Sequence, residues 1–141
     1  MKEMLRVLKL GGLIAFHTWP PELLFGRVFA LVARYMPPPA DPKPAPPSQW
    51  GDPTIVLQRL GSAVRDVTFD RGVQVTSALS PQHYRHMIEQ SGGPIVRLLQ
   101  TLKDDPTRLA RFRREYDEIV SQYFDCNVVR QDFLETRAIK A

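Results

Sequence analysis

Three residues of chemically versatile type follow a short apolar run near the beginning of the chain. Leu13 to Phe16 is a candidate strand, and His17, Thr18 and Trp19 come directly after it, before a Pro20-Pro21 stop. In open α/β sheets ligands bind beyond the carboxyl ends of the strands, where these side chains would lie. An imidazole can act as a general base and an indole can form a pocket wall. We therefore take His17 as a candidate catalytic residue and Trp19 as a candidate substrate-binding residue. The alternative is that both simply pack at a strand end, since the sequence assigns no partner carboxylate to His17.

The other reactive side chains are predicted to be structural. His83 and His86 are three residues apart and share a helix face, but no third ligand has suitable spacing, so a solvated face and no metal site are expected. Cys126 is the only cysteine, so the chain has no internal disulfide, and its place at the expected end of a helix does not favour a thiolate. A single cysteine is typical of a reducing compartment and gives a cytoplasmic expectation.

The charge of the chain excludes some partners. Its 141 residues carry 19 Lys and Arg against 15 Asp and Glu, a net charge of +4. The basic residues 108, 111, 113 and 114 are mixed with acidic neighbours and without interleaved aromatics, so no nucleic-acid partner is expected. The longest apolar tract, Leu23 to Met36, contains two arginines and is shorter than the roughly 20 residues that a membrane span needs.

The elements that would position these residues follow from local patterns. Met1 to Lys9 has helical spacing and ends before Gly11-Gly12, and the strand after it is apolar on both faces, which is typical of a parallel sheet covered on both sides. Glu22 to Met36 reads as an almost wholly apolar helix: a lid over a substrate, an interfacial membrane helix or a dimer contact, of which lid and dimer contact are preferred. Residues 37–47 contain seven prolines and are expected to form an extended, polyproline-type connector.

The rest of the chain alternates helix and strand signals. Asp52-Pro53, Ser80-Pro81 and Asp105-Pro106 each pair a cap with a helix-opening proline, and Pro94 can open a further helix. These predict helices to Leu60, Gln90, Lys103 and about Phe124. Two strands are expected: Val64 to Phe69, ending at the turn signal 70–72 unless Val73 and Val75 continue it, and Val128 to Ile139. The fold class is α/β, with residues 1–141 as a single domain.

The opening LRVLKLGGLIAFHTW resembles a stretch of the class I S-adenosylmethionine-dependent methyltransferases, in which a helix ending in a phrase like RVLKPGG leads into the fifth strand of a seven-stranded sheet. Leu10 stands where that phrase usually has proline. The resemblance implies a partial Rossmann-like sheet of about three strands in the order fifth, seventh, sixth, with Val128 to Ile139 as the antiparallel seventh. It also implies that residues 80–125 are a helical cap insertion of the kind found in small-molecule methyltransferases, which makes Tyr84 a candidate substrate-binding residue.

The sequence departs from that family in one large respect. The family holds its cofactor with a glycine-rich turn after the first strand, and no G-x-G occurs anywhere in this chain, whose eight glycines are expected only at caps and turns. The resemblance therefore implies a C-terminal, substrate-side half that takes a small-molecule substrate, is inactive alone and does not itself bind S-adenosylmethionine. Its expected partner is the missing N-terminal half or a second copy of the chain. The alternative is a non-catalytic, self-associating binding module or relic of the same fold.

Overall fold

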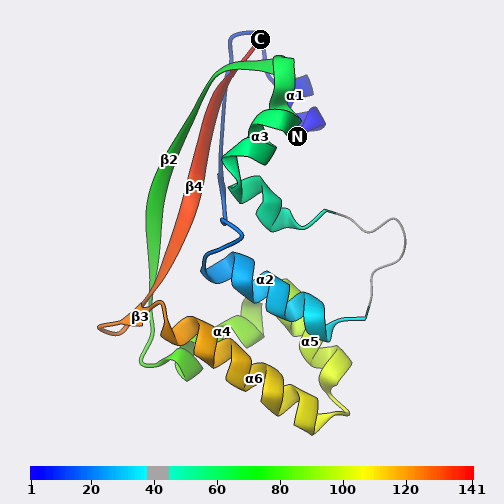
Figure 1. Ribbon diagram of the computed structural model, residues 1–141, viewed down its shortest axis with the longest axis vertical. Helices are drawn as coiled ribbons and strands as arrows, with labels where there is room; N and C mark the ends of the chain where they lie inside the picture. The colour runs from blue at the N-terminus through cyan, green and yellow to red at the C-terminus, as the bar shows by residue number, and fades with distance from the viewer. Residues whose placement is uncertain (38–44) are drawn as a thin grey trace.

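The computed structural model describes residues 1–37 and 45–141, which form a mixed α/β structure built on one long antiparallel ribbon (Figure 1). The helices and strands follow one another in the order α1 (Lys2–Val7), β1 (Leu13–Thr18), α2 (Leu24–Tyr35), the 3-10 helix η1 (Pro47–Gly51), α3 (Pro53–Leu60), the 3-10 helix η2 (Gly61–Ala63), β2 (Val64–Ser77), α4 (Pro81–Ser91), α5 (Gly93–Leu102), α6 (Pro106–Ser121), β3 (Phe124–Asp125) and β4 (Val128–Lys140).

The strand order confirms the sequence-based expectation. The sheet runs β1-β4-β2, and β4 is antiparallel to both neighbours, so β1 and β2 point in the same direction. The short β3 pairs only with β4. The register places Glu135 of β4 between His17 of β1 and Asp70 of β2. Three side chains from distant parts of the sequence therefore share one face of the sheet.

The sequence left open whether residues 70–72 form a turn or whether Val73 and Val75 continue the strand, and the structure shows the continuation, because β2 runs to Ser77. Gly72 pairs with Phe133 across the sheet, and a Cβ built at Gly72 would lie 2.3 Å from the Phe133 ring. A glycine inside a strand often marks such a close approach of a neighbouring side chain. Here the Phe133 ring occupies the space that a side chain at residue 72 would fill, which explains why a glycine stands inside this strand.

Strand β1 was expected to lie inside a parallel sheet covered on both faces, and this expectation is wrong. The strand lies at one edge of the sheet as far as the described residues show, and it pairs antiparallel, not parallel. Ile14 is buried, whereas Leu13 on the opposite face is 59% exposed and Ala15 and His17 are exposed as well. Only one face of β1 is therefore covered.

Two separate hydrophobic clusters stabilise the fold. In Figure 1, α1 and α3 lie beside one end of the ribbon, and α2, α4, α5 and α6 gather at the other end. Val129 of β4 packs into the helical cluster, whereas Ala138 packs with Ile14, Val56 and Leu60 in the cluster beside α3. Residues 129 and 138 project from opposite faces of the strand, so the two clusters cover opposite faces of the ribbon.

Helix α2 belongs to the protein's own core, which corrects its interpretation as a helix held out toward a second subunit. Leu24, Val28 and Leu31 are at most 2% exposed and lie in the helical cluster with Phe112 and Tyr116 of α6. Arg34 at the outer face donates to Glu115 at 2.6 Å. The helix therefore buries its apolar face against the cap helices of the same chain.

All four expected helix starts are confirmed, three of them with side-chain caps, whereas α5 begins at Gly93 without one. The Asp52 carboxylate accepts hydrogen bonds from the backbone of Thr54 and Ile55, and the Ser80 and Asp105 side chains accept from the third residue after each. Helix α6 ends at Ser121 and not near Phe124, because Phe124 and Asp125 pair with β4.

Two remaining sequence expectations concern connecting segments and membranes. The proline-rich connector falls largely on residues 38–44, outside the described residues, and its last residue, Pro47, begins η1. Among the helices that the structure describes, none has the length and apolar character needed to cross a bilayer.

Candidate functional site

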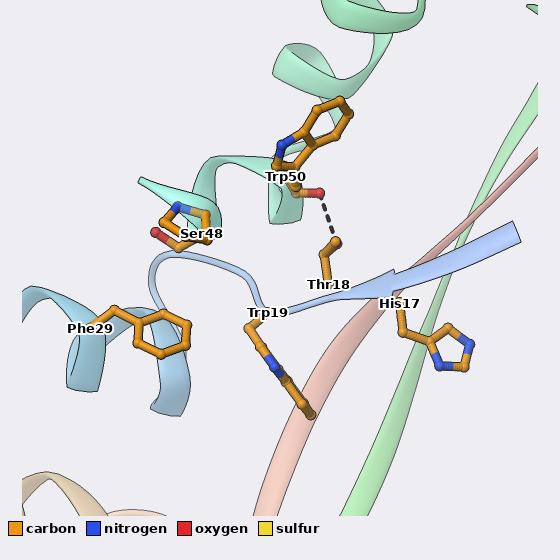
Figure 2. Close-up of a pocket in the computed structure, with 7 residues that line it drawn as sticks. His17, Thr18, Trp19, Phe29, Ser48 and Trp50 are labelled. Carbon is orange, nitrogen blue, oxygen red and sulfur yellow. Dashed lines mark hydrogen bonds between the residues drawn. The ribbon is translucent and has the colours of Figure 1, made fainter. Parts of the chain in front are cut away.

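A cavity of about 270 Å3 lies at the carboxyl end of β1 (Figure 2). Its walls come from three elements that are far apart in the sequence. The end of β1 and the residue after it contribute one side, α2 contributes Phe29, and η1 contributes the remainder; the lining residues are His17, Thr18, Trp19, Phe29, Pro47, Ser48 and Trp50. The structure thus brings His17 and Trp19 together where a strand-end ligand site was expected.

The η1 segment is fixed to the end of β1 by specific contacts. The Thr18 hydroxyl donates to the backbone oxygen of Trp50 at 2.7 Å, which Figure 2 shows as a dashed line. The Trp50 indole lies edge-to-face on Phe16, with centroids 6.0 Å apart, and the Arg59 guanidinium lies 4.6 Å from its centroid. The sequence did not indicate Trp50 and Ser48 as site residues, because they follow the proline-rich segment, where no regular element was expected.

Two glycines hold the backbone that carries Trp19. A Cβ at Gly51 would lie 2.5 Å from the backbone oxygen of Trp19, and a Cβ at Gly26 would lie 2.3 Å from that of Pro21. Only glycine permits backbone segments to come this close. Neither glycine acts as a cap or a turn, which corrects the expectation for them. Because these two residues have no side chain, the Trp19-Pro20-Pro21 segment can pack directly between α2 and η1.

The Trp19 indole belongs to a row of aromatic rings. Its centroid lies 4.5 Å from that of Phe25 and 6.4 Å from that of Phe133, and Phe25 lies 6.1 Å from Phe29. The Trp19–Phe133 pair is edge-on and the other two pairs are tilted, and all three centroid separations lie in the range at which aromatic rings attract one another. This wall of the cavity is therefore rigid before any ligand arrives.

His17 has a partner that the sequence could not assign. Its Nε2 lies 3.2 Å from Glu135 Oε2, and its ring stacks on Phe133 with centroids 4.4 Å apart. Figure 2 shows the imidazole and the Trp19 indole on one side of β1 and Trp50 on the other. Glu135 also accepts from Arg137 Nε at 3.0 Å, and Arg137 reaches Asp70. A carboxylate bound to one ring nitrogen orients the imidazole and leaves the other nitrogen available for proton transfer.

Tyr84 does not join this site. It is 1% exposed and lies within the helical cluster, and its hydroxyl has no partner among the described residues. Burial raises the pKa of Tyr84 to about 12. It also raises the pKa of Tyr116, whose hydroxyl likewise has no hydrogen-bond partner among the described residues. Both phenols therefore remain neutral at physiological pH, and the structure places Tyr84 in the core of the cap, away from the residues that line the cavity.

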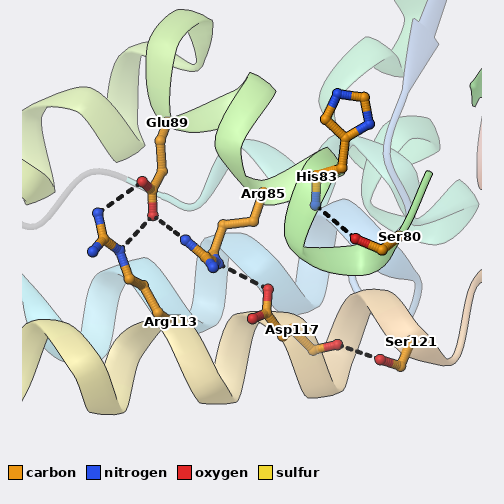
Figure 3. Close-up of polar contacts among 7 residues, drawn as sticks. All are labelled: Ser80, His83, Arg85, Glu89, Arg113, Asp117 and Ser121. Atoms are coloured by element: carbon orange, nitrogen blue, oxygen red, sulfur yellow. Dashed lines mark hydrogen bonds and ion pairs between the residues drawn. The ribbon is translucent and has the colours of Figure 1, made fainter. Parts of the chain in front are cut away.

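An ion-pair network connects α4 and α6 (Figure 3). The Arg113 guanidinium donates to both Glu89 oxygens at 2.9 Å, and Arg85 bridges Glu89 and Asp117 at 3.0 and 2.8 Å. The Glu89 side chain is 8% exposed. Each carboxylate faces at least one guanidinium, so this cluster ties the two helices together and leaves no unpaired acid for catalysis.

The other reactive residues of the sequence are accounted for by local bonds. His83 Nδ1 accepts from the backbone of Leu79 at 3.0 Å, and His86 Nε2 lies 2.9 Å from the Gln90 amide. Within residues 1–37 and 45–141, no three His, Cys, Asp or Glu side chains are arranged to hold a metal ion. Cys126 is exposed in the tight turn between β3 and β4, not at a helix end, and a hydrogen bond with Asp125 raises the pKa of its thiol.

A second cavity, of about 430 Å3, lies where α2 meets the start of α5. Val32, Met36, Gly93, Pro94 and Arg97 line it. Arg97 is its only charged residue and is itself exposed. This cavity contains none of the residues that the sequence singled out.

Comparison with known proteins gives relatives but no function. The chain matches no protein-family model. It is 27% identical over 139 residues to "Uncharacterized protein Rv1405c" of Mycobacterium tuberculosis (strain ATCC 25618 / H37Rv) and to "Uncharacterized protein Mb1440c" of Mycobacterium bovis, covering 98% of this chain and 50% of each relative. It is 25% identical over 134 residues to "Uncharacterized protein Rv1403c" of M. tuberculosis, covering 94% of this chain and 48% of that protein. The chain therefore spans about half the length of the curated relatives it matches.

Proposed function

We propose that this chain is the substrate-side portion of a class I S-adenosylmethionine-dependent small-molecule methyltransferase. The observation that carries the proposal is the sheet order β1-β4-β2 with β4 antiparallel to both neighbours. That order was expected from the opening LRVLKLGG motif together with two later strand signals. In this topology the last strand lies between two earlier strands that point in the same direction, which is the arrangement that the resemblance implies.

The position of the cavity supports the same proposal. It opens at the carboxyl end of β1, where ligands of open α/β sheets bind. Methyl transfer depends chiefly on holding the acceptor atom in line with the methyl group. The rigid wall formed by Trp19 and Phe29 would supply that positioning. In this proposal Trp19 binds the substrate, while Tyr84 supports the cap from its core.

His17 would accept the proton that the methyl acceptor loses. Of the seven residues that line the cavity, His17 alone carries an imidazole, the side chain that most often serves as a general base. Its contact with Glu135 fixes the ring, so Glu135 acts as a positioning residue. Glu135 also accepts from Arg137, and its contact with His17 favours a proton on the imidazole nitrogen that faces it.

The described residues do not fit the cofactor itself. Gly26 and Gly51 are filled by neighbouring backbone, and Gly72 is covered by the Phe133 ring, so none of these presents a free backbone N–H surface to a ligand. No two glycines have the G-x-G spacing. We therefore assign the cofactor to the part of the longer relatives that lies outside the aligned region.

Calorimetric titration with S-adenosylmethionine tests the proposal. We expect no binding by the 141-residue chain and micromolar binding by the full-length M. tuberculosis relative at 27% identity. The matched control is the 139-residue aligned part of that relative, which should behave like this chain. Failure of the full-length relative to bind the cofactor would overturn the proposal. Tight binding by this chain would overturn the assignment of the cofactor to the other half.

A second candidate, a self-associating binding module, is favoured by one observation. β1 is an edge strand within the described part of the chain, and Leu13 on it and Leu10 before it are 59% and 79% exposed. An open strand edge with apolar side chains favours pairing with another strand. Cofactor binding and methyl transfer by the longer relatives would separate the two candidates.

A further inference from the structure

We propose that the cavity at the end of β1 binds a neutral, flat aromatic molecule of one or two fused rings that carries a hydroxyl group. This inference rests on the proposed function and names the substrate class of the same site. Trp19, Phe29, Trp50 and Pro47 supply four of the seven lining residues, and none of the seven is a lysine, arginine or carboxylate. A charged ligand would lose its hydration here without gaining a counter-charge.

The size of the cavity limits the ligand. Pockets for drug-sized molecules usually measure roughly 300–1,000 Å3. At about 270 Å3, this cavity is smaller than that range. Its aromatic walls are held by the Trp19–Phe25 contact and by the close backbone contacts at Gly26 and Gly51. A rigid planar ring loses little conformational freedom in such a site, whereas a flexible alkyl chain loses much more.

Two polar side chains of the lining, Ser48 and His17, can orient the ligand by bonding to its hydroxyl group. The Thr18 hydroxyl is already committed to the Trp50 backbone oxygen. Ser48, which also lines the cavity, is 8% exposed. Figure 2 shows Ser48 on one side of the backbone segment that carries Trp19, and the His17 and Trp19 side chains on the other. A hydroxyl on the ring can therefore bond to one of these groups while the ring lies against the indole.

The chain contains its own reporters for this test. It has two tryptophans, Trp19 and Trp50, and both line the cavity. The two indole N–H signals in a proton–nitrogen correlation spectrum therefore report on the site directly, with Trp19→Phe assigning them. The probes are 2-naphthol, the charged 2-naphthoate and the neutral but flexible 1-octanol, added to the chain without cofactor.

We expect 2-naphthol to shift both indole signals saturably, with at least about tenfold weaker binding of 2-naphthoate and 1-octanol. Equal binding of either comparator, or no saturable shift with 2-naphthol, would overturn the substrate class.

Variants give an independent check. Phe29→Lys should abolish the shifts, whereas Ala30→Lys, an exposed neighbour on the same helix, should leave them unchanged. If Phe29→Lys does not fold, Ser48→Ala serves instead and should weaken 2-naphthol binding by about fivefold. An equal loss in Ala30→Lys, or no loss in either cavity variant, would place the binding elsewhere.

The outcome is separable from that of the proposed function, because no cofactor takes part. Naphthol binding combined with failure of the full-length relative to bind S-adenosylmethionine would retain the site and remove the methyltransferase. Cofactor binding without naphthol binding would retain the methyltransferase and remove this substrate class.

Discussion

At the scale of single residues, close backbone contacts decide where the chemically interesting side chains lie. Gly51 and Gly26 allow η1 and α2 to touch the Trp19-Pro20-Pro21 backbone, and Gly72 allows the Phe133 ring to lie across β2. Phe133 in turn stacks on His17 and contacts Trp19 edge-on. The position of the cavity wall therefore depends on glycines that do no chemistry themselves.

Gly51→Ala tests this dependence. The added methyl group would overlap the backbone of Trp19 and Pro20, so we expect a loss of about 1–3 kcal/mol in the free energy of unfolding and a shifted Trp19 indole signal. Gly93→Ala is the matched control, because a Cβ there meets no atom within 4 Å. Urea denaturation measures both. Equal stability of the two variants would show that the Gly51 contact is not required.

At the scale of elements, α2 joins the cavity to the cap. Its buried face packs against α5 and α6, while Phe25 and Phe29 reach toward Trp19. An element that contributes to both the core and the site transmits changes from one to the other.

Leu31→Glu should unfold the helical cluster. Leu31 is 1% exposed, and a carboxylate there has no described cation placed to pair with it, so we expect a loss of at least about 4 kcal/mol. Ala33→Glu, on the exposed face of the same helix, should change stability by less than about 0.5 kcal/mol. Circular dichroism during thermal unfolding distinguishes them. A folded Leu31→Glu variant of reduced oligomeric state would restore the interpretation of α2 as a subunit contact.

The network between α4 and α6 should make the cap sensitive to acid. Burial by itself raises the pKa of Glu89, but hydrogen bonds and charge from Arg113 and Arg85 outweigh it, so the pKa lies below its ordinary value of 4.5. A lowered pKa in the folded state means that the carboxylate stabilises the fold above about pH 4.5 and that this contribution is lost as the pH falls through the folded pKa.

Glu89→Gln removes that contribution. We expect the variant to be about 2 kcal/mol less stable than the wild-type protein near neutral pH, with the difference shrinking at about pH 3. Glu118→Gln on the exposed side of α6 is the control and should show neither effect. Urea titrations at both pH values provide the measurement, and a difference that does not depend on pH would contradict the assignment.

At the scale of the whole molecule, two hydrophobic clusters share one ribbon and leave part of it uncovered. The α3 cluster covers one face of the ribbon and the cap covers the other at its far end. The face that carries Leu13, His17 and Arg137 remains exposed, as does Val75 near the cap. Such a surface, together with the open edge of β1, favours association.

We expect the isolated chain to form a dimer at high micromolar concentration, seen by sedimentation equilibrium as twice its mass of 16.1 kDa. Leu13→Lys should weaken the dimer by placing a charge beside the β1 edge, whereas Leu79→Lys, at a still more exposed site in the loop before α4, should not. A persistent monomer would contradict the prediction. Equal weakening by both variants would move the contact away from β1.

Much of the local structure follows from the sequence alone. The caps at Asp52, Ser80 and Asp105 each bond to backbone two or three residues away, so the information for these helix starts is contained in a few neighbouring residues. The buried stripe of α6, with Phe112, Tyr116 and Val120, likewise follows from helical spacing. Local signals predicted the order of the elements, and the resemblance supplied the strand order.

The tertiary structure alone decided the site. His17 and Glu135 are 118 residues apart, and they meet only because β1 and β4 pair in one register. Gly72 belongs to a turn signal in the sequence, yet it lies within a strand because β2 pairs with β4 there. The Phe133 ring then occupies the space that a Gly72 side chain would need. Tyr84 was assigned to a substrate surface, yet it is buried because the cap helices pack on each other. Burial and register depend on all the elements together, and a local pattern contains no information about which distant surface will cover it.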